Sequence, residues 1–141
     1  MTLPSILPTT EQLTTAIQSV LPDAAAAWLY GSAASGSMNA ESDIDIAVLL
    51  PPKDPRKTAW ALGQEAQSLS ERWHRKVDLV NFSAVSCVLQ KEILTAGKPL
   101  FSKDEFVVAK AALQALGQYR DFNERNAQEF ARIARTGKVF A

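Results

Sequence analysis

The chain has 141 residues, and its 15 Lys and Arg balance 15 Asp and Glu, so the formal net charge is zero. This balance argues against a general nucleic-acid coat protein, and we expect no direct nucleic-acid binding. A hydrophobic content of 47% argues against disorder and favours one domain over residues 1–141. We expect a cytoplasmic protein without a signal peptide, a membrane helix or an internal disulfide, because apolar runs are short and Cys87 is the single cysteine.

The first half of the chain predicts a helix and two strands. Thr9 and Gln12 fit a capping box, and apolar residues follow at helical spacing. The run "AAAAWLY" over residues 24–30 favours a buried strand that ends at Gly31. "DIDIAVLL" over residues 43–50, closed by two prolines, predicts the second strand.

The middle of the chain predicts a helix, a strand and a further helix. Asp54 is expected to cap a helix with Pro55 at its first position, ending near His74. "KVDLVNF" over residues 76–82 predicts a third strand. Ser83 is expected to cap the next helix, which carries apolar residues at helical spacing.

The end of the chain predicts a short extended piece, "KPLF", and then a helical tail. Ser102 and Glu105 fit a second capping box, and Gly117 is a candidate helix break. The order of elements predicts an α/β (α+β) fold, with a small mixed sheet packed with helices. We expect its core over about residues 10–101 and a C-terminal helical extension over about 102–136.

Two aspartates stand one residue apart in the second predicted strand. Alternation places Ile44, Ile46 and Val48 on one face, towards the core. Asp43 and Asp45 then share the other face, with their Cα atoms roughly 6–7 Å apart. A hard divalent cation such as Mg²⁺ would relieve the repulsion between two such carboxylates. A pair of exposed turn aspartates is the alternative.

A glycine-serine pair and a third acid add to this pattern. Gly31 allows a sharp turn whose backbone N–H groups can cradle phosphate, and Ser32 adds a hydroxyl donor. A simple turn is the alternative there. Asp78 lies in an apolar strand, where an acid is costly unless it is paired or ligated. It would suit a general base beside the other aspartates, or else form a salt bridge with Arg75 or Lys76.

The spacing Gly31-Ser32, ten residues, Asp43-x-Asp45 and then Asp78 resembles the signature of the nucleotidyltransferase superfamily typified by DNA polymerase β. The chain is similar to the minimal nucleotidyltransferases of prokaryotes over roughly residues 28–101. Two pieces, "SDIDIAVL" and "VDLVNFSAVSCVLQKEILTAGKPLF", resemble the antitoxin (MNT) branch of HEPN/MNT toxin–antitoxin pairs.

The resemblance implies a polymerase β-like fold and AMP transfer from ATP onto a tyrosine of a cognate HEPN ribonuclease toxin. It implies that Asp43, Asp45 and Asp78 are catalytic and bind Mg²⁺, with two ions expected. It also implies that Gly31, Ser32, Asp43 and Asp45 bind the nucleotide. The expected partners are the toxin and ATP, with no membrane.

One stretch departs from the family pattern. Many minimal members carry a "GSRARG"-like loop, whereas this loop is "GSAASG", with Ala33 and Ser35 at the basic positions. A binding module that neutralises its toxin sterically is therefore one alternative, although the retained acidic triad argues against it. A small-molecule nucleotidyltransferase of the aminoglycoside type is another, and the absence of an obvious acceptor domain counts against that.

Overall fold

The structure, a computed structural model, describes residues 8–35 and 43–139. The described chain alternates helices and strands before a long final helix, as predicted. In order, its elements are α1 (Thr10–Val20), β1 (Ala26–Tyr30), α2 (Ser32–Ser35), β2 (Ile44–Leu49), α3 (Gly63–Trp73), β3 (Val77–Asn81), the 3₁₀ turn η1 (Phe82–Ala84), α4 (Cys87–Ala96), β4 (Lys98–Ser102) and α5 (Glu105–Thr136).

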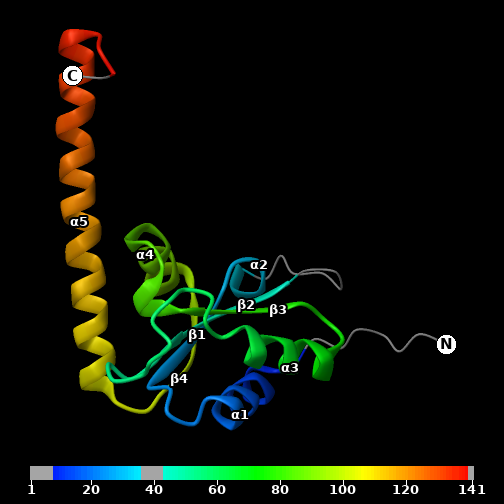
Figure 1. Cartoon of the computed structure of the whole chain (residues 1–141). Coiled ribbons are helices and arrows are strands. Elements are labelled where there is room, and N and C mark those ends of the chain that lie inside the picture. Colours follow the sequence, from blue (N-terminus) through cyan, green and yellow to red (C-terminus); the bar gives the residue numbers. More distant parts are fainter. Residues whose placement is uncertain (1–7, 36–42, 140–141) are drawn as a thin grey trace.

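The four strands form one mixed sheet in the order β3-β2-β1-β4 (Figure 1). β1 is antiparallel to both of its neighbours, while β2 and β3 are parallel. The parallel pair is connected through α3, because parallel strands need a crossover and cannot be joined by a tight turn. This arrangement confirms the predicted mixed sheet packed with helices.

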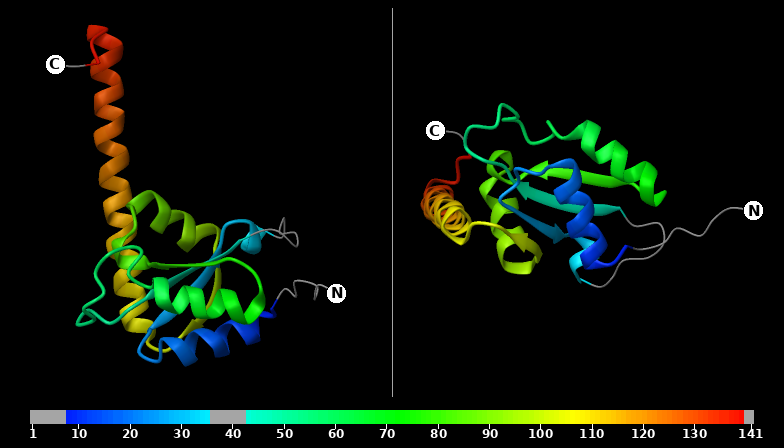
Figure 2. Two further views of the ribbon diagram at one scale, coloured as in Figure 1. Left: turned by 45° about the vertical axis from the view of Figure 1, so that its right-hand side comes forward. Right: turned by 90° about the horizontal axis from the view of Figure 1, so that it is seen from below.

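Each face of the sheet packs against its own helices (Figure 2). Ile44, Ile46 and Val48 are buried in a cluster with residues of α1 and α3, so the predicted core face is confirmed. Ala47 and Leu49 belong to a second cluster with residues of α4 and α5. Because side chains alternate along a strand, Asp45 lies on this second face of β2.

Two details of the helix boundaries follow the sequence pattern. The Thr9 hydroxyl accepts from the Gln12 backbone N–H at 3.1 Å, and the Thr9 N–H donates to the Gln12 side chain at 2.9 Å. The predicted capping box of α1 is therefore confirmed. α3 ends at its C-cap residue His74, which adopts a left-handed conformation with φ of 51°.

The predicted helix start at Asp54 is wrong, because α3 begins at Gly63. The Asp54 carboxylate instead binds the Arg56 guanidinium, with N–O distances of 2.9 and 2.7 Å. It also accepts the Arg56 backbone N–H at 2.9 Å. The Asp54 side chain is therefore bound to Arg56 and does not cap a helix.

Three further local predictions are corrected. Ser86, not Ser83, caps α4 by accepting the Leu89 N–H at 3.2 Å, because a 3₁₀ turn separates β3 from the helix. Asp104, rather than Ser102, caps α5 and accepts from two backbone N–H groups at 3.1 and 3.2 Å. Gly117 does not interrupt α5, since the helix is continuous through it.

The helix α5 begins against the sheet and its C-terminal half projects beyond the other elements (Figures 1 and 2). Ala115 is only 2% exposed against the second core cluster. Leu113 and Phe130 on the same helix are each 73% exposed. None of the described helices combines the length and apolar character that crossing a membrane requires.

Candidate active site

Three polar side chains lie in one row across the sheet. Tyr30 at the end of β1 is the register partner of Asp45 on β2, and Asp45 is the partner of Asp78 on β3. Directly opposed residues project from the same face of a sheet. The strand pairing therefore brings Asp45 and Asp78 together on the face that carries α4 and α5, as expected if their strands were neighbours.

The carboxyls of Asp45 and Asp78 are close enough to form a side-chain hydrogen bond. Partial burial, and then the charge of Asp78, raise the pKa of Asp45 from 3.8 to about 6. The charge of Asp43 contributes to this rise, and the charge of Lys76 opposes it. Two carboxylates held in this way need a shared proton or a bound cation between them.

Tyr30 borders the same pair of acids. Burial, and then the charges of Asp45 and Asp78, raise the pKa of its phenol from 10.0 to about 12. The phenol therefore stays neutral at physiological pH, and its ring packs against the second core cluster. Tyr30 forms an apolar wall with a polar tip at one side of the carboxylate pair.

Gly31 turns the chain directly beside Asp45. Its φ of 69° is in the left-handed region, which favours glycine. A Cβ at this position would lie 2.8 Å from Asp45 Oδ2. Conformation and close approach thus both require glycine here. Ser32 follows as the first residue of α2, which is only four residues long, and the Gly31 carbonyl accepts the Ala34 N–H at 3.2 Å.

Asp43 lies just before β2, at the edge of the site. Its Oδ2 is 3.8 Å from Lys76 Nζ, and the two side chains are 45% and 68% exposed. The Ile44 N–H donates to the Lys76 carbonyl at 2.9 Å. This bond joins the beginning of β2 to the residue just before β3. Within residues 8–35 and 43–139, no three His, Cys, Asp or Glu side chains already form a group that could hold a metal ion.

The structure therefore brings Gly31, Asp45 and Asp78 into one place, with Ser32 next in the chain and Asp43 at the rim. The roles predicted for these five residues remain predictions. The middle of the predicted phosphate loop, residues 36–42, lies outside the described residues, as do the side chains of Ala33 and Ser35.

Sequence reasoning missed two contributors to this site. In the sequence, Tyr30 was interpreted only as the last residue of a strand. Its position beside Asp45 depends on the strand register. Lys76 was weighed as a partner of Asp78, whereas the structure pairs it with Asp43. The available signal for Lys76 was its position one residue before β3, at the end of the strand where the acids gather.

Comparison with known proteins agrees with this geometry. The profile of the family "Polymerase beta, Nucleotidyltransferase" matches residues 11–106, which contain the whole sheet. A curated relative, the protein adenylyltransferase MntA of Shewanella oneidensis, is 36% identical over 78 residues. That alignment covers 55% of this chain and 54% of the relative, so the chain spans about half the length of the relative it matches.

Solved structures share the fold. A chain in the crystal structure of a toxin–antitoxin complex with AMP-PNP superimposes with a TM-score of 0.73 and 24% identity, covering 90% of this chain and 99% of that chain. A chain in the complex of the tri-AMPylated Shewanella oneidensis HEPN toxin with its MNT antitoxin gives a TM-score of 0.66 and 23% identity. The second match covers 89% of this chain and 95% of that chain.

Proposed function

This chain belongs to the Polymerase beta nucleotidyltransferase family, and we propose that it transfers AMP from ATP to a tyrosine hydroxyl of a cognate HEPN ribonuclease toxin, thereby acting as its antitoxin. The observation that carries the proposal is the Asp45–Asp78 carboxyl pair, held in register beside the left-handed Gly31 turn. The relative named protein adenylyltransferase and the complexes of toxins with antitoxins support the acceptor and the partner.

The residues present fit a magnesium site. The Asp78 carboxyl lies beside Asp45 and raises its pKa, and Mg²⁺ prefers paired oxygen ligands of this kind. Asp43, Asp45 and Asp78 would hold two Mg²⁺ ions, with Asp43 turning from Lys76 by side-chain rotation. When bound, the ions would neutralise phosphate charge and stabilise the charge that develops during transfer.

Residues of the chain itself would bind the phosphate and accept the proton. The Gly31 turn presents its backbone to an incoming phosphate, and Ser32 provides a hydroxyl beside it. We propose that Asp78 accepts the proton of the acceptor hydroxyl, because it lies beside Asp45 on the same face of the sheet. Catalysis would then consist mainly of positioning the acceptor and the α-phosphate in line.

We place the acceptor on a partner protein, because one of the similar solved complexes contains an AMPylated HEPN toxin. The exposed Leu113 and Phe130 of α5 are apolar surface of the kind that a protein partner buries. The alternative function is neutralisation by steric binding alone. Ala33 and Ser35 in place of basic residues favour this alternative, because they remove two contacts to a triphosphate.

The test is a transfer assay with the purified protein, Mg²⁺, labelled ATP and the toxin encoded beside it. We expect mass spectrometry to find AMP on a toxin tyrosine and the toxin's ribonuclease activity to fall. A variant carrying Asp45→Asn and Asp78→Asn should do neither, whereas the control Asp23→Asn, in the exposed turn after α1, should do both. Equal neutralisation by the wild type and the double variant would establish steric binding instead.

A further inference from the structure

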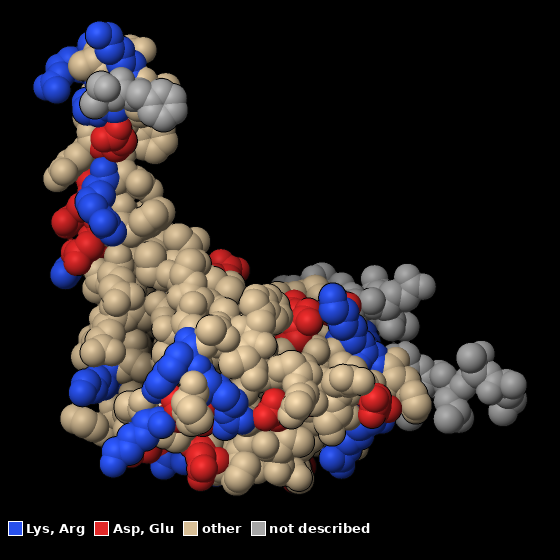
Figure 3. Space-filling model, in the orientation of Figure 1, with Lys and Arg blue, Asp and Glu red and all other residues tan. Residues whose placement is uncertain are grey.

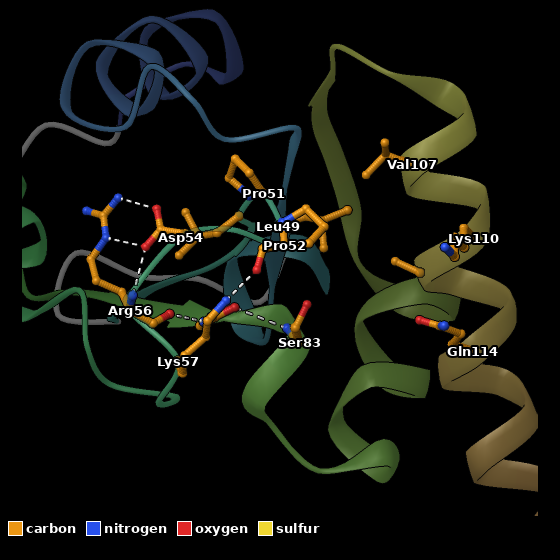
Figure 4. Close-up of a pocket in the computed structure, with 13 residues that line it drawn as sticks. Leu49, Pro51, Pro52, Asp54, Arg56, Lys57, Ser83, Val107, Lys110 and Gln114 are labelled. Carbon is orange, nitrogen blue, oxygen red and sulfur yellow. Dashed lines mark hydrogen bonds and ion pairs between the residues drawn. The ribbon is translucent and has the colours of Figure 1, made fainter.

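A separate pocket of about 440 Å³ opens at the other end of β2 from the carboxylates (Figure 4). Leu49, which lines it, lies four residues beyond Asp45, or roughly 13 Å along the strand. The walls come from three segments: the loop after β2, the turn after β3, and the first turns of α5. Its size falls within the range of small-molecule sites, about 300–1,000 Å³.

The walls of this pocket are held in place by their own hydrogen bonds. In the loop after β2, Arg56 binds Asp54 through two nitrogens and binds Glu65 of α3 at 2.8 Å. The buried Asn81 donates to the Arg56 carbonyl at 2.8 Å, and its side-chain oxygen accepts the Ser83 N–H at 3.2 Å. One buried amide thus connects two walls, so the pocket is formed before any ligand arrives.

The charge left over in the pocket is positive. Among the described residues, Asp54 is the only carboxylate that lines the pocket. It forms an ion pair with the Arg56 guanidinium. Lys57 and Lys110 line the pocket from the loop and from α5. The Lys57 ammonium donates to the Pro52 carbonyl, and its charge also lowers the pKa of Asp54, which is already bound by Arg56. Figure 3 shows that Lys and Arg side chains on this face of the molecule have Asp and Glu side chains among them.

We propose that this pocket is a second ligand site, separate from the carboxylate site, for a small molecule that carries a phosphate group. Two ammonium groups match the double negative charge of a phosphate monoester, and Ser83 and Gln114 add a hydroxyl and an amide donor. Val107 and Ala111, which are only partly buried, offer an apolar surface for the rest of the molecule. The proposal does not depend on the proposed AMP transfer.

Amide NMR titrations with inorganic phosphate and with AMP test this site, in EDTA so that no divalent cation is present. We expect saturable shifts in residues 49–57 and 107–114, and smaller ones around Asp45. A Lys57→Gln/Lys110→Gln variant should bind roughly tenfold more weakly, since removing two exposed charge contacts costs about 1–2 kcal/mol. The matched control Lys53→Gln/Lys98→Gln carries the same net charge but changes two exposed lysines that do not line the pocket.

A second matched pair separates the pocket from bulk charge. Gln114→Glu places a carboxylate in the pocket wall, whereas Gln118→Glu makes the same change one turn further along α5, outside the lining. We expect only Gln114→Glu to weaken phosphate binding. Equal weakening by both variants, shifts confined to residues around Asp45, or the absence of saturable binding to the wild type would each overturn the proposal.

Discussion

Asp45 on β2 and Asp78 on β3 are direct register partners on parallel strands, and Asp78 raises the pKa of Asp45. This pairing stores electrostatic repulsion in the folded state whenever both acids are ionised. The fold keeps the pair because the apolar residues on either side of each acid are buried, which holds the strands in this register. The predictions below follow from this pair and from the residues around it.

The stability of the protein without divalent cations should fall as pH rises from about 4 to about 6. The pKa of Asp45 is 3.8 in its ordinary state and about 6 in the fold. Between these values the folded state holds a proton that the unfolded state has released, so raising the pH favours unfolding. Because the group is half exposed, we expect a loss of about 1 kcal/mol, below the full linkage value.

Urea denaturation in EDTA at pH 4.5 and pH 7 measures this loss. The variant Asp45→Asn carries no titrating group at this position and should show a shallower dependence on pH over the same interval. An identical pH dependence in the wild type and the variant would show that the Asp45–Asp78 pair does not control it.

Replacing one acid of the pair with a neutral residue should raise the stability of the protein and abolish its activity. We expect Asp45→Asn to stabilise the metal-free protein at pH 7.5 by about 1 kcal/mol, because it removes the like-charge repulsion with Asp78. The same change should abolish the proposed AMP transfer, because it removes one of the carboxylates that we propose hold magnesium. Urea midpoints and the transfer assay measure the two effects. A variant that is destabilised as well as inactive would indicate that the carboxylate supports the fold.

Replacing Gly31 should damage both the turn and the site. A Cβ there would lie 2.8 Å from Asp45 Oδ2, and the left-handed φ of 69° adds backbone strain. We expect Gly31→Ala to cost about 1–3 kcal/mol and to lower AMP transfer strongly. Thermal or urea unfolding together with the transfer assay measures both.

The matched control for this change is Gly117→Ala. Gly117 lies within α5, where an added Cβ meets no other atom within 4 Å. Since alanine favours helix, we expect this variant to be more stable by about 0.5–1 kcal/mol. If both glycine variants lose stability to the same degree, the close approach at Gly31 is not the cause.

Removing Lys76 should strengthen the binding of divalent cations. Its ammonium lies 3.8 Å from Asp43 and lowers the pKa of Asp45, so it opposes a second cation near these carboxylates. We expect Lys76→Ala to raise Mn²⁺ affinity roughly threefold in the absence of nucleotide. It should change stability by less than about 0.5 kcal/mol, because the ion pair is exposed.

Calorimetric titration with Mn²⁺ measures this affinity, with Lys98→Ala as a control for the loss of one exposed lysine on β4. A fall in affinity for the Lys76 variant alone would mean that Lys76 positions Asp43 for the metal rather than competing with it.

Several parts of the fold were predictable because they depend on neighbouring residues. The capping box at Thr9, the end of α3 near His74 and the alternation that buries Ile44 follow from local geometry. The mistaken helix start at Asp54 has a different cause. Its carboxylate is taken by Arg56, which is held in turn by Glu65 of α3.

The sequence by itself determined the mixed sheet, the family pattern of glycine, serine and acids, and the face of β2 on which Asp45 lies. Only the tertiary structure decided that Asp45 opposes Asp78, that Tyr30 completes their row, and that Lys76 pairs with Asp43. The physical reason is the distance along the chain over which each effect acts. Backbone propensity and alternation act within a few residues, whereas strand register depends on burial across the whole sheet. A shift of one residue in that register would have moved the two acids to opposite faces.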